Sequence, residues 1–278
     1  MSEDRIPMPE QPEPKKFNAP LWAGAVVVVG LIIVLLVNVF GDKDTLTVDD
    51  LNPPAVAALD GGSEVYPPNS ELAFTENVKF GYLPAPTLTT LDDGTVVAAD
   101  PETAAETLGL PDGLGGLTVD EFEDRTIKPP REGTEPGTPM TWQQVLDAVA
   151  GSTVVVPLIP DTATAEPALA AIAKADMAAS TIVRTADAEV ARAAADAGIA
   201  AMFVGDPTAT AEKELADQGY TMVAVDAADA GDWTDSGLGV WATGVADKKQ
   251  LDGLASQGVI GALATNPYAV LPSTVKTN

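Results

Sequence analysis

Histidine and cysteine are both absent from the 278 residues of this chain. Histidine is the commonest general base and the commonest transition-metal ligand in proteins. Its absence excludes Ser-His-Asp catalysis, Cys-His catalysis and histidine-ligated zinc. The absence of cysteine excludes disulfide bonds, so we expect the fold to depend on a large hydrophobic core.

Basic residues are scarce: 15 Lys and Arg stand against 41 Asp and Glu, a net charge of −26. Residues 1–40 contain three basic and four acidic residues, so residues 41–278 carry −25. This excess argues against binding to nucleic acid or to anionic lipid headgroups, because both attract basic surfaces. Some extracytoplasmic domains are simply acidic, so the charge alone identifies no partner.

Only one long hydrophobic run is present, the uncharged residues 21–40. A helix of that length covers about 30 Å, the thickness of a bilayer core. The run ends without a small-residue cleavage pattern, which favours an uncleaved single-pass anchor over a signal peptide. Arg5, Lys15 and Lys16 precede it and only Lys43 follows closely, which predicts a cytoplasmic N-terminus, a plasma-membrane location and an extracytoplasmic C-terminal domain.

The remaining boundaries follow from composition. Residues 1–20 contain five prolines and mixed charge, which predicts a disordered cytoplasmic tail. Residues 41–53 are polar and read as a stalk. Residues 54–278 are patterned as a folded domain.

Short apolar runs alternate with helical segments through this domain. We expect strands at 55–59, 84–91, 95–99, 153–159, 181–184, 199–204, 221–225, 240–243 and 259–264, and helices at 69–81, 141–150, 166–177, 188–197, 208–218 and 248–256. Such alternation predicts βαβ units and a parallel sheet. The size favours a TIM (β/α)8 barrel, with a doubly wound open sheet as the alternative. No Walker A or G-x-G-x-x-G motif supports nucleotide binding.

Residues 100–139 interrupt the alternation. They are rich in proline, glycine and acidic residues, so we expect an irregular excursion. A loop of this length is typically functional or disordered. We therefore take it as the candidate surface for contact with another protein.

A series of short motifs resembles the glycerophosphodiester phosphodiesterase family. The family's A-H-R-G-G-S and P-E-N-T-x-x-A-F are similar to A-L-D-G-G-S at 58–63 and P-P-N-S-E-L-A-F at 67–74. Its D-G turn and V-V-x-H-D resemble D-G-T-V-V-A-A-D at 93–100, and its P-T-L-E-E-V-L resembles M-T-W-Q-Q-V-L at 140–146. Its W-T-V-N and G-V-D-G-I-I-T-D-x-P resemble residues 243–246, 258–261 and 265–267. The resemblance covers about residues 55–267 and implies a TIM barrel.

The residues that the family uses for chemistry are replaced. Leu59 stands for the first histidine, Ala99 or Asp100 for the second, and Asp60 for the arginine that would pair with phosphate. The acid of P-E-N-T becomes Pro68, the metal-binding E-x-D becomes Ala85-Pro86-Thr87, and Pro157 replaces the carboxylate of a later strand, which also loses its lysine. Divalent ions need several oxygen ligands, and a transferring phosphoryl group needs cationic stabilisation. We therefore predict no catalytic residues, no bound metal, no cofactor and no enzyme activity.

Two other groups were candidate sites. The carboxylates of Asp60, Glu64 and Asp100 follow strands and are candidates for a Ca²⁺ site or an acid/base pair, although loop carboxylates in so acidic a domain are usually solvated. The aromatic residues Trp233, Trp241, Tyr66 and Tyr82 are candidates to line a groove, with packing as the more common role.

These observations predict a catalytically inactive, membrane-anchored barrel that serves as a binding or scaffolding subunit of a larger bacterial membrane or envelope complex. Its partners would be membrane lipid through residues 21–40 and other membrane or envelope proteins. One alternative is a divergent phosphodiester, lipid-headgroup or glycan hydrolase that uses carboxylates. The other is a sensor that holds a small ligand in the former pocket.

Overall fold

The computed structural model describes residues 45–273. Among these residues, no helix has both the length and the apolar character needed to cross a membrane. The predicted tail at 1–20, the predicted span at 21–40 and the first residues of the predicted stalk lie outside the described residues.

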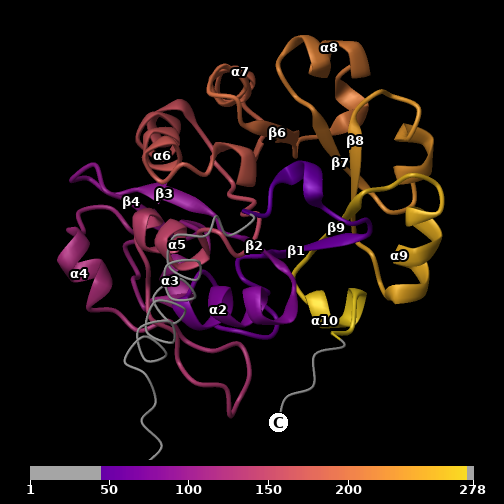
Figure 1. Ribbon diagram of the computed structural model, residues 1–278. Helices are drawn as coiled ribbons and strands as arrows, with labels where there is room; N and C mark the ends of the chain where they lie inside the picture. The colour runs from indigo at the N-terminus through magenta and orange to yellow at the C-terminus, as the bar shows by residue number, and fades with distance from the viewer. Residues whose placement is uncertain (1–44, 274–278) are drawn as a thin grey trace, which may run out of the picture. The chain divides into compact units, whose positions relative to one another are not determined.

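A curled parallel sheet forms the centre of the fold (Figure 1). Its strands are β1 (Ala55–Leu59), β2 (Leu83–Ala85), β5 (Ile182–Thr185), β6 (Ala200–Phe203), β7 (Met222–Asp226), β8 (Gly239–Thr243) and β9 (Gly261–Ala264). They lie in the order β2-β1-β9-β8-β7-β6-β5, and each neighbouring pair is parallel. The predicted α/β class with a parallel sheet is confirmed.

Residues 153–159 lie between the two outer strands and hydrogen-bond to both. On one side the N–H groups of Val156 and Leu158 donate to the carbonyls of Pro84 and Pro86, both at 2.8 Å. On the other side Ile182 N–H donates to Val155 O at 3.0 Å. The sheet therefore closes on itself. The predicted strand at 153–159 is reduced to isolated bridges, because Pro157 has no N–H to donate.

Helices cover the outside of the sheet. They are α2 (Glu71–Phe80), α5 (Trp142–Val149), α6 (Thr162–Lys174), α7 (Ala188–Asp196), α8 (Glu212–Asp217), α9 (Lys248–Ala255) and α10 (Pro267–Val270). The helix predicted at 69–81 begins at Glu71, because Asn69 has φ +53° and Ser70 caps the helix by accepting from Ala73 N–H. The helix predicted at 208–218 is divided into a 3-10 turn at 207–209 and α8.

The strand predicted at 84–91 is wrong as one element, because Pro86 divides it. β2 belongs to the curled sheet, whereas β3 (Leu88–Thr90) pairs antiparallel with β4 (Val96–Ala98) in a separate two-stranded sheet. Residues 92–94, between the strands predicted at 84–91 and 95–99, form the turn that joins β3 to β4.

The core has an outer and an inner layer, as expected when alternate strand residues face opposite sides. On β7, Val223 and Val225 pack under the helices, whereas Met222 and Ala224 belong to the inner cluster with Trp241. Leu46, Val48 and Leu51, which precede β1, pack against this inner cluster. The barrel interior is therefore filled by side chains.

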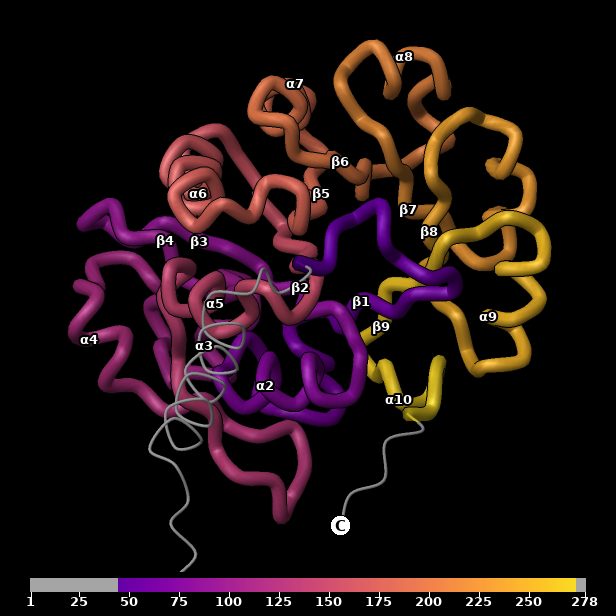
Figure 2. Tube along the Cα trace, viewed as in Figure 1, coloured from indigo at the N-terminus to yellow at the C-terminus, as the bar shows by residue number. Residues whose placement is uncertain are grey.

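Residues 100–139 are more ordered than the sequence suggested. They include α3 (Ala104–Thr107) and α4 (Val119–Glu123), and Figure 2 shows this part of the chain between β4 and α5. Their apolar side chains form a third cluster with the β3–β4 hairpin: Leu91, Val97, Ala99, Ala104, Leu108, Leu110, Leu114, Phe122 and Ile127. We call residues 100–139 the excursion.

Candidate functional site

The loop after β1 has an unusual backbone. Asp60, Gly61 and Gly62 all have positive φ, at +50°, +79° and +81°. A Cβ at Gly61 would lie 2.5 Å from Ala73 Cβ, so only glycine fits where the loop meets α2. Backbone conformations of this kind persist where the surroundings hold them, and they often occur at functional sites.

Asp60 is held by side chains from two other parts of the chain. Its Oδ1 accepts from Thr87 Oγ1 at 2.7 Å and from Asn69 Nδ2 at 3.1 Å. Asn69 Oδ1 in turn accepts from Thr87 N–H at 3.1 Å. The structure therefore joins the predicted positions Asp60 and Thr87 directly, and this network ties the end of β1 to the residues before α2 and after β2.

Arg184 lies inside the barrel beneath this network and is 6% exposed. Its Nε donates to Val156 O at 2.9 Å, and Nη2 donates to Ala85 O and Pro86 O at 2.9 and 3.2 Å. Burial lowers the pKa of the guanidinium to about 10, and the nearby charge of Asp60 acts in the opposite direction. The group remains protonated at neutral pH.

The position of Arg184 follows from the prolines around it. Leu158 N–H donates to Pro86 O and Leu88 N–H donates to Leu158 O, so the register places the nitrogen of residue 86 opposite Val156 O. Pro86 has no hydrogen to donate there, and Arg184 Nε supplies it instead. Arg184 was not among the predicted positions, because the sequence marks it only as a single arginine within the apolar run of β5.

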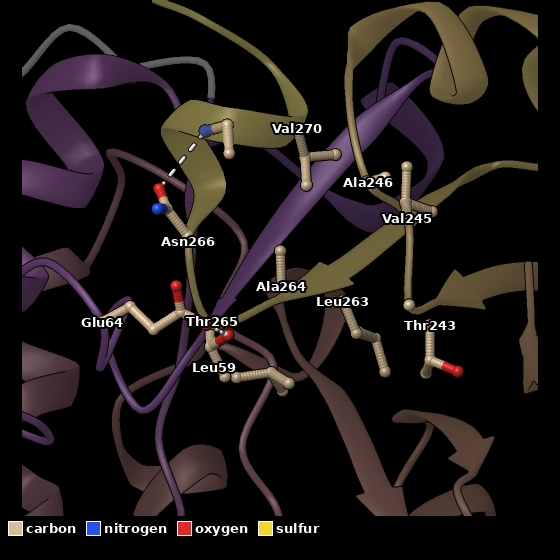
Figure 3. Close-up of a pocket in the computed structure, with 12 residues that line it drawn as sticks. Leu59, Glu64, Thr243, Val245, Ala246, Leu263, Ala264, Thr265, Asn266 and Val270 are labelled. Carbon is tan, nitrogen blue, oxygen red and sulfur yellow. Dashed lines mark hydrogen bonds between the residues drawn. The ribbon is translucent and has the colours of Figure 1, made fainter.

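A cavity of about 350 Å³ opens between the carboxyl ends of β1, β8 and β9 (Figure 3). Its apolar walls come from Leu59, Val245, Ala246, Leu263, Ala264, Ala269 and Val270, and its polar groups are Glu64, Thr243, Thr265 and Asn266. Glu64 Oε1 accepts from Thr265 Oγ1 at 2.6 Å. We call this the β1–β9 cavity; of the predicted positions, Leu59 lines it.

A second cavity, of about 360 Å³, lies between the loop after β1 and the excursion. It is lined by Asp60, Ser63, Pro68, Thr103, Glu106, Thr107, Lys128, Pro129 and Pro130. A small recess beside it holds the predicted positions Pro68, Ala99 and Asp100. The excursion therefore forms one wall of the cavity at the end of β1.

The three candidate carboxylates do not share a cavity. Glu64 lines the β1–β9 cavity, Asp60 the second cavity and Asp100 the recess. Asp100 accepts from Glu102 N–H and Thr103 Oγ1 in its own turn, at 2.9 and 3.2 Å. Across residues 45–273, no group of three or more acidic side chains is placed to hold a metal ion.

The aromatic candidates are divided between two roles. Trp241 is fully buried in the inner core and Trp233 packs against the outer core. Tyr66 and Tyr82 instead pack edge-to-face around Tyr268, and the hydroxyls of Tyr66 and Tyr268 are 2.8 Å apart. The structure therefore does not unite the four residues in one groove.

Comparison with known proteins gives matches only among solved structures. No family model and no curated protein matches the chain. A glycerophosphodiester phosphodiesterase from Agrobacterium tumefaciens matches at 14% identity and a TM-score of 0.66, over 77% of this chain and 97% of that one. One from Thermotoga maritima matches at 14% identity and a TM-score of 0.63, over 77% and 95%. An Oleispira antarctica phosphodiesterase, solved with the product sn-glycerol-3-phosphate, matches at 16% identity and a TM-score of 0.63, over 77% and 94%.

At these identities the likeness is one of fold. The described domain has an α/β fold whose curled parallel sheet resembles the glycerophosphodiester phosphodiesterase barrel. The resemblance predicted from the short motifs is confirmed at this level.

The prediction that the chain is not an enzyme is contradicted by the same comparisons, because the solved structures that share its fold are phosphodiesterases. The prediction depended on the replaced residues, among them Leu59, Ala85 and Pro157. Their replacement removes groups that the glycerophosphodiester phosphodiesterase family uses for metal-dependent hydrolysis. It does not exclude catalysis by other groups on the same fold.

Proposed function

We propose that this chain is a membrane-anchored accessory subunit whose barrel-like domain binds another membrane or envelope protein, for example in a respiratory or transport assembly. The excursion would provide the contact surface. Residues 21–40 would anchor the chain in the plasma membrane with the N-terminus in the cytoplasm, as the arrangement of basic residues favours.

One observation carries the proposal: at the carboxyl end of the barrel, the excursion and the β3–β4 hairpin share a hydrophobic cluster that is distinct from the two barrel clusters. Phe122 is completely buried there, and Leu108, Leu110 and Leu114 are each less than 9% exposed. A simple connector between a strand and a helix does not need forty residues or a separate core. The order of this segment supports a role as a binding platform.

The charge of the excursion indicates the chemistry of the partner. It contains ten acidic and three basic residues, and its exposed acids include Asp112, Asp120 and Asp124. The ion pairs formed within residues 45–273 all lie in α2, α8 and α9. Carboxylates without cationic partners favour a partner with a basic face.

Co-purification tests this proposal. The full chain would be isolated from its native membranes in mild detergent, and the proteins that accompany it identified. The variant Asp112→Asn/Asp120→Asn/Asp124→Asn should lose a specific partner. The matched control Glu212→Gln/Glu214→Gln/Asp229→Asn, which removes three charges elsewhere, should retain it. Equal retention by both variants would exclude the excursion as the contact surface.

Phosphodiester hydrolysis is the second candidate function, and the named activity of the structures that share the fold favours it. Because the chain has no histidine, the proton transfers would need carboxylates, with Glu64 and Asp60 beside the two larger cavities. Release of glycerol 3-phosphate from a glycerophosphodiester by the full chain tests it. Activity that falls in Glu64→Gln or Asp60→Asn would favour this function, and activity unchanged in both would exclude these carboxylates.

A further inference from the structure

The β1–β9 cavity combines a carboxylate at one edge with apolar side chains elsewhere, and the partner-binding role does not involve these residues. Among residues 45–273, Glu64 is the only charged residue that lines it, and no lysine or arginine of this part of the chain does. Glu64 Oε1 accepts from Thr265 Oγ1, whereas Oε2 has no hydrogen-bond partner among the described residues. A ligand in the cavity would therefore meet a carboxylate oxygen that is free to accept.

The side of the cavity opposite Glu64 is mostly apolar, with Thr243 as its polar residue. Figure 3 shows Val270, Ala264, Leu263 and Val245 around the space, with Glu64 and Thr265 together at one edge. Pockets for small organic molecules typically measure 300–1,000 Å³ and combine apolar walls with a few polar groups. At about 350 Å³, this cavity is at the lower end of that range.

We propose that the β1–β9 cavity binds a small organic ammonium ion with an aliphatic body. The ammonium group would donate to Glu64 Oε2, and the aliphatic body would lie against Leu263, Val245 and Val270. An anion of the same shape would be repelled by the Glu64 carboxylate, because no lysine or arginine among the lining residues would offset its charge. This site is separate from the excursion, so it does not depend on the partner-binding proposal.

Three probes of equal length but different head group separate charge from shape: n-butylammonium, butyrate and 1-butanol. Each would be titrated into the isotopically labelled full chain in mild detergent, and the amide shifts of Val245, Thr265 and Ala269 followed by NMR. We expect saturable shifts with butylammonium at millimolar concentration, at least fivefold weaker binding of butanol, and no saturable shifts with butyrate.

Two variants test the two sides of the cavity. Glu64→Gln keeps the shape and removes the charge, and should weaken butylammonium binding about tenfold. Ala269→Trp places a large side chain at an exposed lining position and should abolish it. Glu106→Gln, a matched change in the second cavity, should leave it unaltered. Equal binding of butyrate, an unchanged affinity in Glu64→Gln, or an absence of saturable shifts with butylammonium would each overturn the proposal.

Discussion

Arg184 brings a charged group into the barrel interior and distributes its hydrogen bonds over three main-chain carbonyls. Arg184→Met keeps most of the volume but leaves Val156 O without a donor, whereas Ala85 O and Pro86 O still accept from Asp60 N–H and Leu158 N–H. A buried carbonyl left without a donor costs about 1–3 kcal/mol, so we expect a loss of that size in the free energy of unfolding. Urea unfolding measures it. Arg192→Met on the exposed surface of α7 is the control and should change stability by less than about 0.5 kcal/mol.

The explanation of Arg184 by the missing N–H of Pro86 can be tested separately. Pro86→Ala supplies an N–H opposite Val156 O. In that background Arg184→Met should cost less than in the original chain, with a coupling free energy of about 1 kcal/mol in a double-mutant cycle. Additive costs would show that Arg184 does not substitute for this backbone donor.

Tyr220 offers a prediction with a defined pH dependence. Its buried hydroxyl has no hydrogen-bond partner among residues 45–273, and burial raises its pKa to about 12. An unfolded tyrosine titrates near pH 10, so between about pH 10 and 12 the unfolded chain loses this proton first and stability falls as pH rises. Tyr220→Phe should reduce that fall while leaving stability at pH 7 equal or higher. Denaturant unfolding at pH 7, 10 and 11 checks both statements, and an unaltered slope above pH 10 would contradict the first.

Asp60 and Thr87 could be identified from the sequence, whereas Arg184 could not, and the difference lies in the kind of partner that each residue contacts. Asp60 and Thr87 were found because short motifs mark strand ends, where side chains meet at the same edge of a parallel sheet. Arg184 was not found because its partners are backbone carbonyls 28, 98 and 99 residues away. A carbonyl carries no sequence signal, so such contacts are visible only in the folded chain.

At the scale of elements, the excursion is expected to behave as a unit. Phe122→Ala removes its largest buried side chain, and such truncations typically cost about 3–5 kcal/mol. The excursion joins the barrel mainly through the β3–β4 hairpin, so we expect local unfolding of residues 100–139 with the barrel retained. Hydrogen exchange by peptide mass spectrometry would detect it. Glu123→Ala is the control, and protection lost equally throughout the barrel would refute an independent core.

Element boundaries were predictable where one residue type sets them. Thr141, the first residue of the helix predicted at 141–150, caps α5 with Gln144 in a capping box. The strand predicted at 84–91 failed because an apolar run does not show that Pro86 divides it between two sheets. The core of the excursion was missed because its apolar residues are spread among glycine, proline and acidic residues without a regular period.

At the scale of the molecule, the charge imbalance should limit stability. Acidic residues outnumber basic ones by 26, and the described ion pairs are all partly exposed pairs within a helix. Salt should screen more repulsion than attraction. Between 0.05 and 0.5 M NaCl we expect Tm to rise by roughly 2–4 °C, the shift that about 1 kcal/mol produces in a domain of this size. Potassium chloride at equal ionic strength should act alike, and a fall in Tm would contradict the expected screening of repulsion.

Site-specific photo-crosslinking in intact native cells tests whether the excursion contacts a membrane or envelope protein. A photoreactive amino acid would replace Asp120 or Asp124 in the excursion, or Lys213 on α8, which lies far from α4 in Figure 2. We expect both excursion positions to crosslink to the same membrane or envelope protein, and position 213 to give no such product. The crosslinked product should be lost when Asp112 is changed to Asn together with whichever of Asp120 and Asp124 does not carry the photoreactive residue. Crosslinking to that protein from position 213 alone, or none from either excursion position, would contradict this expectation.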